Sequence, residues 1–258
     1  MSDEGSSQVS AAPRGGDNLP VISVIVPVKN ESGNIAPLVA EIATALAGSA
    51  FEIVYVNDGS TDATEQEVRA LMPQHAWLRQ IRLKSSCGQS AAIRTGVATA
   101  RAEIVVTLDG DGQNDPAFIP ALLGAFGSPR IGLVAGQRVG RKASGFKKLQ
   151  SRVANAIRSA VLKDGTRDTG CGLKAFRRDL FLSLPYFNGL HRFLPALVRR
   201  EGLDIAYVEV TDRPRRYGTS KYGFWDRLWI GLVDLFGVWW LIRRKKRIPQ
   251  SVEVTLAH

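Results

Sequence analysis

The chain has 258 residues, 45% of them hydrophobic, which is enough for one domain with a sizeable core. Its two cysteines, Cys87 and Cys171, form no disulfide framework and no metal-ligand spacing, so a disulfide-stabilised secreted domain is excluded and a reducing compartment is expected. Residues 1–136 carry nine Lys and Arg against fourteen Asp and Glu, whereas residues 137–258 carry twenty-five against ten. The second half is therefore expected to meet an anionic partner, and charge alone allows nucleic acid, phospholipid or a phosphorylated substrate.

Strand and helix patterns alternate along the first half of the chain. Residues 1–20 are rich in Ser, Gly and Ala, lack the pattern of a signal peptide and are predicted to form a disordered tail. Short apolar runs then predict strands over residues 22–28, 51–56, 81–83, 104–108 and 131–139. Helices are predicted between them, over residues 35–46, 61–71 (with Thr61 as the cap), 89–99 and from Asp115-Pro116 onward. This rhythm predicts an α/β fold in which helices cover both faces of a mainly parallel sheet.

The strand over residues 104–108 runs directly into Asp109-Gly110-Asp111-Gly112-Gln113. Ligands of open α/β sheets bind outside the carboxyl ends of the strands. Two carboxylates at that place suit a Mg²⁺ or Mn²⁺ ion that carries a diphosphate. The alternative is an ordinary Asp-Gly surface turn.

After residue 139 the regular pattern fades into a basic region, with a helix predicted over residues 146–162. Between residues 137 and 178 only two acidic residues, Asp164 and Asp168, oppose twelve basic ones. These are Arg138, Arg141, Lys142, Lys147, Lys148, Arg152, Arg158, Lys163, Arg167, Lys174, Arg177 and Arg178. A solvated surface helix normally mixes both signs, so the excess favours a phosphate-bearing acceptor at an anionic membrane surface.

Three segments that end predicted strands resemble the family 2 glycosyltransferases of the GT-A fold. They are residues 27–31 (PVKNE), 56–60 (VNDGS) and 109–113 (DGDGQ). Within that family the chain resembles the polyprenyl-phosphate glycosyltransferases of the dolichol-phosphate mannose synthase type, over roughly residues 22–221. The resemblance implies one GT-A (Rossmann-like) domain over residues 21–222. It also implies an inverting transfer of a hexose from a GDP- or UDP-linked donor to dolichyl or undecaprenyl phosphate at the cytoplasmic face of the membrane.

The resemblance also implies roles for residues on the donor side. Pro27, Glu31 and Asp58 would line the nucleoside pocket, although Asp58 could instead be a simple turn residue. Lys29 stands where the family often has an aromatic residue. The residues expected to hold Mg²⁺ or Mn²⁺ on the donor diphosphate are Asp109, Asp111 and Gln113. Lys84 and Gly88 could approach the nucleotide, or Gly88 could serve only the turn between strand and helix.

On the acceptor side, a phosphomonoester is already anionic near neutral pH and can attack the sugar without a general base. Arg138 and Arg152 are expected to bind its phosphate, because a guanidinium binds two phosphate oxygens at once. Residues 168–177 resemble a family segment that shapes the floor of the active site, where Asp168 would either orient a basic group or touch the donor sugar. Residues 213–221 resemble a closing loop that would bring Arg215, Ser220 and Lys221 to the donor phosphates, or else form a solvated basic loop.

Residues 223–247 contain a tryptophan-rich apolar stretch followed by a run of five basic residues. Asp226, Arg227 and Asp234 disfavour a transmembrane span, since charges are costly at the bilayer centre. The pattern favours an amphipathic helix in the membrane surface, followed by a tail over residues 248–258. The alternative is a helix that packs on a partner, either a second copy of the chain or an integral-membrane protein.

Three other functions stay open at this stage. One is transfer of sugar to a hydroxyl of a glycan or glycolipid, which the scarcity of acceptor-side carboxylates disfavours. A non-catalytic membrane-surface adaptor is disfavoured by the intact aspartate pair, and a nucleic-acid binder by the acidic first half of the chain.

Overall fold

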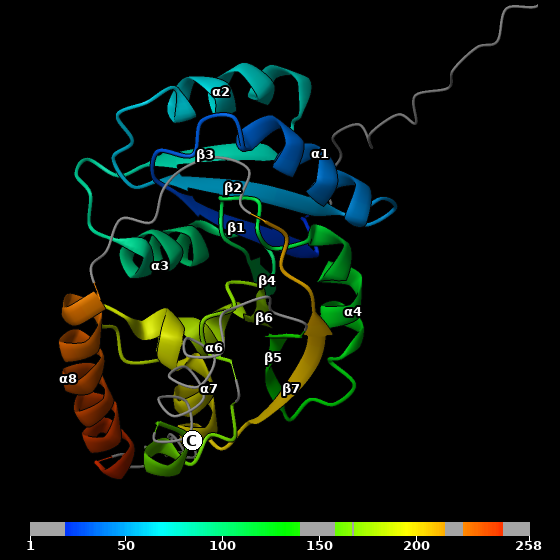
Figure 1. Ribbon diagram of the computed structural model, residues 1–258. Helices are drawn as coiled ribbons and strands as arrows, with labels where there is room; N and C mark the ends of the chain where they lie inside the picture. The colour runs from blue at the N-terminus through cyan, green and yellow to red at the C-terminus, as the bar shows by residue number, and fades with distance from the viewer. Residues whose placement is uncertain (1–18, 140–157, 167, 215–223, 245–258) are drawn as a thin grey trace, which may run out of the picture.

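The computed structural model describes residues 19–139, 158–166, 168–214 and 224–244, and its core is a seven-stranded sheet with the order β3-β2-β1-β4-β6-β5-β7 (Figure 1). The strands are β1 (Ile22–Val28), β2 (Phe51–Asn57), β3 (Leu78–Arg82), β4 (Ile104–Thr107), β5 (Ile131–Arg138), β6 (Lys174–Arg177) and β7 (Asp204–Val210). The α-helices are α1 (Ile35–Ala45), α2 (Thr64–Leu71), α3 (Gln89–Thr99), α4 (Ile119–Gly124), α6 (Arg178–Ser183), α7 (Leu190–Arg200) and α8 (Phe224–Arg243). Two 3-10 turns, η1 (Met72–Gln74) and η2 (Pro116–Phe118), complete the set.

The first four strands form the parallel half of the sheet. β1 pairs with β2 on one side and with β4 on the other, and β2 pairs with β3, all in parallel. β1 and β2 are buried along almost their whole length, which explains why they appear in the sequence as continuous apolar runs. The predicted α/β fold with a mainly parallel sheet is confirmed.

The second half of the sheet contains a reversal that the sequence analysis did not predict. β6 runs antiparallel to both β4 and β5, and β7 is parallel to β5. β6 has four residues and begins and ends with a charged one, so no apolar run marks it as a buried strand. β7 is mostly half-buried and begins with an exposed Asp204, which likewise conceals it.

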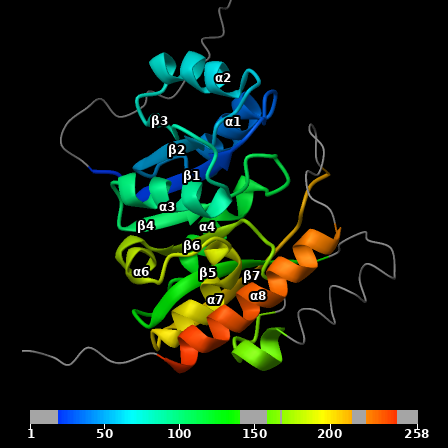
Figure 2. The same cartoon turned by 90° about the vertical axis from the view of Figure 1, so that its left-hand side faces the viewer.

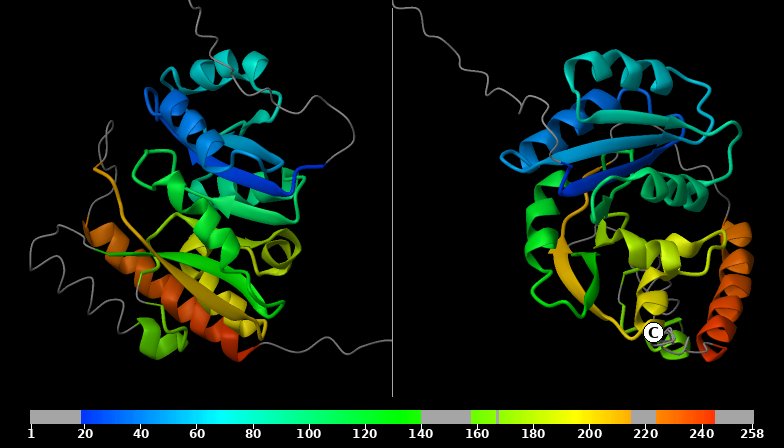
Figure 3. Two further views of the ribbon diagram at one scale, coloured as in Figure 1. Left: turned by 90° about the vertical axis from the view of Figure 1, so that its right-hand side faces the viewer. Right: turned by 180° about the vertical axis from the view of Figure 1, so that it is seen from behind.

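Helices cover both faces of the sheet (Figure 3). One core cluster unites α1, α2 and α4 with the sheet, and a second unites α3, α6 and α7 with the opposite face. α8 lies outside this second layer and packs lengthwise against α7, as Figure 2 shows. Its Val238 is buried in the second core cluster, with Leu235, Trp239 and Ile242 packed against the same cluster.

Several predicted boundaries differ from the structure. Thr61 does not cap α2: the helix begins at Thr64, whose backbone N–H donates to the Asp62 carboxylate at 3.0 Å. The third strand begins at Leu78 rather than at residue 81, and the segment after Asp115 begins as a 3-10 turn before α4. In the predicted basic helix over residues 146–162, only residues 158–162 are described, and they are helical. The predicted tails lie outside the described residues, apart from residues 19 and 20.

Candidate active site

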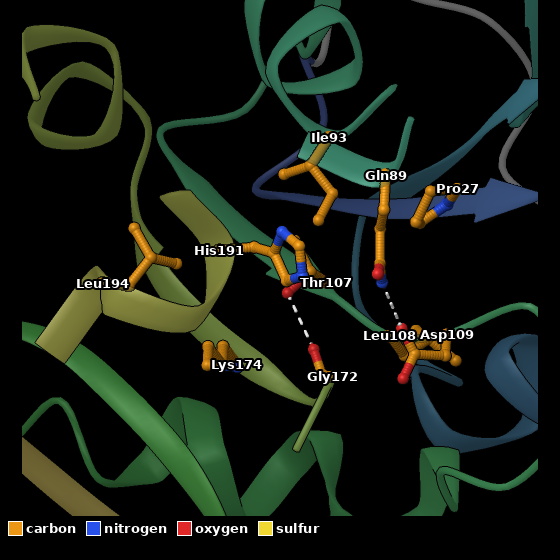
Figure 4. A pocket seen from close by; sticks show the side chains of 10 residues that line it. All are labelled: Pro27, Gln89, Ile93, Thr107, Leu108, Asp109, Gly172, Lys174, His191 and Leu194. Atoms are coloured by element: carbon orange, nitrogen blue, oxygen red, sulfur yellow. Dashed lines mark hydrogen bonds between the residues drawn. The ribbon is translucent and has the colours of Figure 1, made fainter. Parts of the chain in front are cut away.

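A pocket opens where the carboxyl ends of β1 and β4 meet the amino-terminal ends of α3 and α7 (Figure 4). β1, α3, β4, β6 and α7 and their adjoining loops all contribute side chains to it. The lining residues are Pro27, Gln89, Ile93, Thr107, Leu108, Asp109, Gly172, Lys174, His191 and Leu194. The pocket therefore lies at the edge of the sheet where ligands of open α/β folds bind.

Hydrogen bonds fix the loop of residues 109–113, the aspartate loop, beside this pocket. The backbone N–H of Asp109 donates to Asn114 Oδ1 at 3.0 Å, and Gln89 Nε2 donates to Asp109 Oδ1 at 2.7 Å. Gly172 faces Asp109 so closely that a Cβ there would lie 2.4 Å from the carboxylate. A side chain at position 172 would displace Asp109, so this glycine is required for the observed geometry.

The charges of the loop fit a divalent cation. Burial, the larger cause, and repulsion from Asp111, the second cause, raise the pKa of Asp109 to about 6. Asp111 is buried as well, and its carboxylate accepts the backbone N–H of Gln113 at 3.1 Å. A half-buried and a buried carboxylate that repel each other are an arrangement that a cation stabilises.

Within the part of the chain that the structure describes, no group of three or more His, Cys, Asp or Glu side chains could hold a metal ion. Asp109, Asp111 and Gln113 stay the predicted metal ligands, and phosphate oxygens of a ligand would have to complete the coordination.

In the predicted nucleoside pocket, Asp58 binds protein groups. Its carboxylate accepts hydrogen bonds from Ser86 Oγ at 2.9 Å, from the Cys87 N–H at 2.6 Å and from the Gly88 N–H at 3.0 Å. Asp58 therefore fixes the loop that leads from β3 into α3. Lys29 Nζ also donates to Ser86 Oγ, at 2.8 Å, and joins the loop after β1 to the same place.

The other predicted donor-side residues are placed differently. Pro27 lines the pocket described above. Glu31 accepts a hydrogen bond from Asn34 Nδ2 at 3.1 Å in the turn before α1. Gly88 has a positive φ of 88° and forms the N-cap of α3, which fits its predicted role in the turn. Lys84 is exposed and lies outside the pocket lining.

Arg138 lies at the end of β5 in a network of ion pairs. Its Nε donates to Asp168 Oδ2 at 2.6 Å, its Nη2 to Asp168 Oδ1 at 2.8 Å and its Nη1 to Asp212 Oδ2 at 3.0 Å. Burial alone would raise the pKa of Asp168, but the hydrogen bond and charge of Arg138 lower it below the usual value. Asp168 thus orients a basic group, Arg138, while its contact with the donor sugar stays a prediction.

Several residues of the basic region lie inside the protein. Arg158 is buried and pairs with the buried Asp164 at 2.5 Å. Lys174 is only 3% exposed and donates to the Cys171 carbonyl. The expectation that all twelve basic residues of this region face a phosphorylated acceptor or the membrane is therefore wrong for Arg158 and Lys174. Arg158 instead pairs with the buried Asp164, and Lys174 lines the pocket.

The segment after β7 is attached to the aspartate loop. The Arg213 N–H donates to the Gln113 carbonyl at 2.8 Å, and its guanidinium pairs with Asp115 at 2.6 Å and with Glu41 at 2.7 Å. The chain therefore leaves β7 directly beside the predicted metal site. The predicted residues that follow, Arg215, Ser220 and Lys221, lie outside the described residues, as does Arg152.

Sequence reasoning missed Gln89, Ser90 and His191 and gave Lys174 no place in the pocket. Gln89 and Ser90 begin a helix whose start was predicted, so their position beside the pocket could have been inferred. Lys174 comes from β6, whose four residues with charged ends carry no strand pattern. His191 comes from α7, which has the apolar spacing of an amphipathic helix, but nothing in the sequence places that helix beside the pocket.

Helix α8 presents two different faces. Val238 is buried against the protein, whereas Val233, Phe236 and Trp240 are exposed. Arg243 stacks over Trp239 and Arg244 over Trp240 at the end of the helix. Asp234 points toward the first turn of α7, where its Oδ2 would lie 2.8 Å from a Cβ on Gly189. Of the described helices, none combines the length and the apolar character needed to cross a bilayer.

Comparison with known proteins relates this chain to enzymes that act on lipid-linked phosphates. Dodecaprenyl-phosphate galacturonate synthase of Rhizobium johnstonii is 34% identical over 250 residues, which cover 93% of this chain and 74% of that protein. Undecaprenyl-phosphate 4-deoxy-4-formamido-L-arabinose transferase of Pectobacterium carotovorum subsp. carotovorum is 30% identical over 211 residues, covering 81% of this chain and 64% of that one. The chain thus spans less than two thirds of the length of the second relative.

Solved structures share the fold. Glucosyl-3-phosphoglycerate synthase from Mycobacterium tuberculosis, in complex with Mn²⁺, uridine diphosphate and glucosyl-3-phosphoglycerate, has a TM-score of 0.65 at 23% identity, over 86% of this chain and 80% of that one. The model of the family described as glycosyl transferase family 2 matches residues 23–184, more than half of the chain. With the aspartate pair at the end of β4 and a relative at 34% identity, these matches show that the chain belongs to the family 2 glycosyltransferases.

Proposed function

We propose that the protein transfers a sugar from a nucleotide sugar to a polyprenyl phosphate, with Mg²⁺ or Mn²⁺ held by Asp109, Asp111 and Gln113. The observation that supports this most is the pair of mutually repelling carboxylates, Asp109 half-buried and Asp111 buried, at the carboxyl end of β4. The names of the two relatives, which act on dodecaprenyl and undecaprenyl phosphate, support the acceptor class. Those names contain two kinds of sugar, galacturonate and 4-deoxy-4-formamido-L-arabinose, so they leave the donor sugar of this chain open.

The acceptor chemistry agrees with the residues near the pocket. A bound divalent ion would stabilise the nucleoside diphosphate as it leaves. A polyprenyl phosphate oxygen is already charged, so the chain needs to position it rather than deprotonate it. Inversion then follows from direct attack of that oxygen on the anomeric carbon. Asp168 is paired with the predicted acceptor-side residue Arg138, which suits a positioning role better than that of a general base.

On the acceptor side, we propose that Arg138 and Arg152 contribute to binding of the lipid phosphate. Arg138 uses one edge of its guanidinium for Asp168 and one nitrogen for Asp212, so it would reach a phosphate with the hydrogens that remain. Arg215, Ser220 and Lys221 follow the segment that Arg213 attaches to the aspartate loop, a position that supports their proposed contact with the donor phosphates.

We further propose that α8 holds the enzyme on the cytoplasmic face of the membrane. Its exposed residues Val233, Phe236 and Trp240 form one apolar stripe, while Asp234 turns toward α7. Arg243 and Arg244 at the end of this stripe suit anionic lipid headgroups. A second copy of the chain or an integral-membrane protein on the same stripe is the alternative.

The experiment for this proposal uses purified protein with Mn²⁺, a panel of radiolabelled nucleotide sugars and a short-chain polyprenyl phosphate. The matched acceptor is the polyprenol of the same length without its phosphate. We expect lipid-linked sugar only with the phosphorylated acceptor, and we expect Asp111→Ala to abolish it. Equal transfer to the polyprenol would instead support a hydroxyl acceptor, and full activity of the variant would contradict the assigned metal site.

A further inference from the structure

Two carboxylates hold the guanidinium of Arg138, and they bind it in different ways. Asp168 binds one edge: it accepts from Nε at 2.6 Å and from Nη2 at 2.8 Å. It also accepts the backbone N–H of Gly170 at 3.0 Å. Asp212 accepts from Nη1 through Oδ2 at 3.0 Å, whereas its buried Oδ1 has no hydrogen-bond partner in the described part of the chain. Asp212 is therefore the more weakly held of the two carboxylates.

The charges around Arg138 are not balanced. Asp168 alone would neutralise the guanidinium, so Asp212 adds a second negative charge to a single positive one. Lys174 also contributes to this region, but its charge acts on Asp109 as well as on Asp168. The side chains of Arg138 and Asp212 are only 11% and 13% exposed, so water screens the charge of this carboxylate weakly. A surplus carboxylate with an unpartnered buried oxygen is costly, which argues against a purely stabilising role for Asp212.

Asp212 occupies the nitrogen of Arg138 that a phosphate needs. Because Asp168 binds the edge formed by Nε and Nη2, the second hydrogen of Nη2 lies at the edge that Nη2 shares with Nη1. Arginine binds a phosphate most strongly through two parallel hydrogen bonds from one edge. A phosphate at this second edge would share Nη1 with Asp212, and the two negative charges would repel each other.

We infer that Asp212 is a displaceable ligand of Arg138, which leaves Nη1 when the acceptor phosphate binds, while Asp168 keeps the guanidinium in place. The inference rests on the proposed function, in which Arg138 binds the phosphate of the polyprenyl acceptor. The exchange requires only the Asp212 side chain to rotate, because a backbone bridge to Asn114 holds its main chain beside the aspartate loop. Asp212 thus competes with the acceptor, and the two carboxylates have opposite effects on acceptor binding.

The test measures kcat and the KM of a short-chain polyprenyl phosphate at saturating donor and Mn²⁺. Asp212→Asn keeps an oxygen for Nη1 but removes the competing charge. We expect it to lower the acceptor KM about tenfold and to change kcat by less than about threefold. Asp168→Asn removes a negative charge from the same guanidinium, yet it should raise this KM about tenfold, because the bond that orients Arg138 is weakened. Shifts in opposite directions separate displacement from a general change in charge.

The matched control is Asp204→Asn, at the other end of β7, where the exposed pair with Arg130 joins the same two strands; it should leave both constants unchanged. In an Arg138→Met background, Asp212→Asn should no longer lower the acceptor KM, since the competition takes place on that guanidinium.

A higher acceptor KM in Asp212→Asn would overturn the inference and make Asp212 a second residue that orients Arg138. An equal fall of this KM in the Arg138→Met background would also overturn it, because the effect would then be one of long-range charge. If circular dichroism shows that Asp212→Asn does not fold, Asp212→Ser carries the comparison. In each of these outcomes lipid-linked sugar still forms; a folded wild type that forms none with any nucleotide sugar would contradict the proposed function instead.

Discussion

Asp109 is subject to two opposing requirements in the metal-free protein. Its burial and the nearby Asp111 raise its pKa to about 6, whereas the binding of a cation requires its charged form. Folding thus places two carboxylates where they repel each other, a cost that suits a functional site rather than a stable core.

Asp109→Asn is therefore expected to stabilise the metal-free protein while it abolishes transfer. In the wild type the folded pKa lies above the unfolded value of about 3.9, so at pH 7 the charged carboxylate destabilises the native state. The neutral amide removes this penalty and can still accept the hydrogen bond from Gln89, and we expect a gain of about 1 to 3 kcal/mol in the free energy of unfolding. Urea unfolding in EDTA measures it.

Asp204→Asn is the matched control, because Asp204 is exposed and pairs only at the surface with Arg130. It should change the free energy of unfolding by less than about 0.5 kcal/mol. A lower free energy of unfolding for Asp109→Asn would show that the charged carboxylate stabilises the metal-free protein, and it would contradict a destabilising repulsion between Asp109 and Asp111.

The same pKa predicts how metal binding depends on pH. Above pH 6 Asp109 is charged and binds Mn²⁺ without losing a proton, whereas below pH 6 the ion must displace a proton. We expect Mn²⁺ affinity, measured by electron paramagnetic resonance between pH 5 and 8, to be level above about pH 6.5 and to fall about tenfold per pH unit below about pH 5.5. An affinity that does not change over this range would contradict the raised pKa.

At the residue scale the sequence predicts what lies at strand ends and misses what comes from distant segments. Asp109 and Asp111 follow an apolar run, so their place at the edge of the sheet could be inferred. Lys174 and His191 reach the pocket only because β6 inserts antiparallel between β4 and β5 and α7 packs behind it. A four-residue strand with charged ends gives no pattern from which that insertion could be predicted.

At the element scale, α8 shows the difference between predicting a helix and predicting its orientation. Its composition indicates an amphipathic helix, but tryptophans occur all along it and no single polar face stands out. The packing of Val238 against the protein decides the orientation and leaves Phe236 and Trp240, which are 67% and 49% exposed, on the outside.

The double variant Phe236→Ser with Trp240→Ser is expected to weaken binding to vesicles of anionic phospholipid at least about tenfold, because it removes two large apolar contacts with the interface. The free energy of unfolding should change little, since both side chains are exposed. Co-sedimentation with vesicles and urea unfolding provide the two measurements.

Val21→Ser is the control for this variant, because Val21 is equally exposed but precedes β1, away from α8. It should bind vesicles like the wild type. If the double variant also binds normally but its molecular mass in solution falls from a dimer to a monomer, the exposed stripe of α8 is an interface between copies of the chain and the membrane role is wrong.

At the scale of the whole molecule, the uneven charge of the chain corresponds to a division of the sheet. The acidic first half forms β1 to β4 and the aspartate loop, and the basic second half forms β6, β7, α7 and α8, of which β6 and α7 contribute side chains to the pocket. In the parallel half, β1, β2 and β4 could be predicted, because they are buried along almost their whole length and appear as apolar runs, whereas the half-buried edge strand β3 was only partly predicted. The second half could not, since its basic residues partly serve internal ion pairs such as Arg158–Asp164 and Arg138–Asp168.

The central claim is that a divalent ion at the carboxyl end of β4 holds the donor diphosphate. Crystals of the protein grown with Mn²⁺ and a nucleoside diphosphate test it through the anomalous scattering of manganese. The account predicts one strong peak between the carboxylates of Asp109 and Asp111, with oxygens at about 2.1 to 2.2 Å, bridged to the diphosphate. A nucleotide bound at full occupancy with no manganese at these two side chains would contradict it.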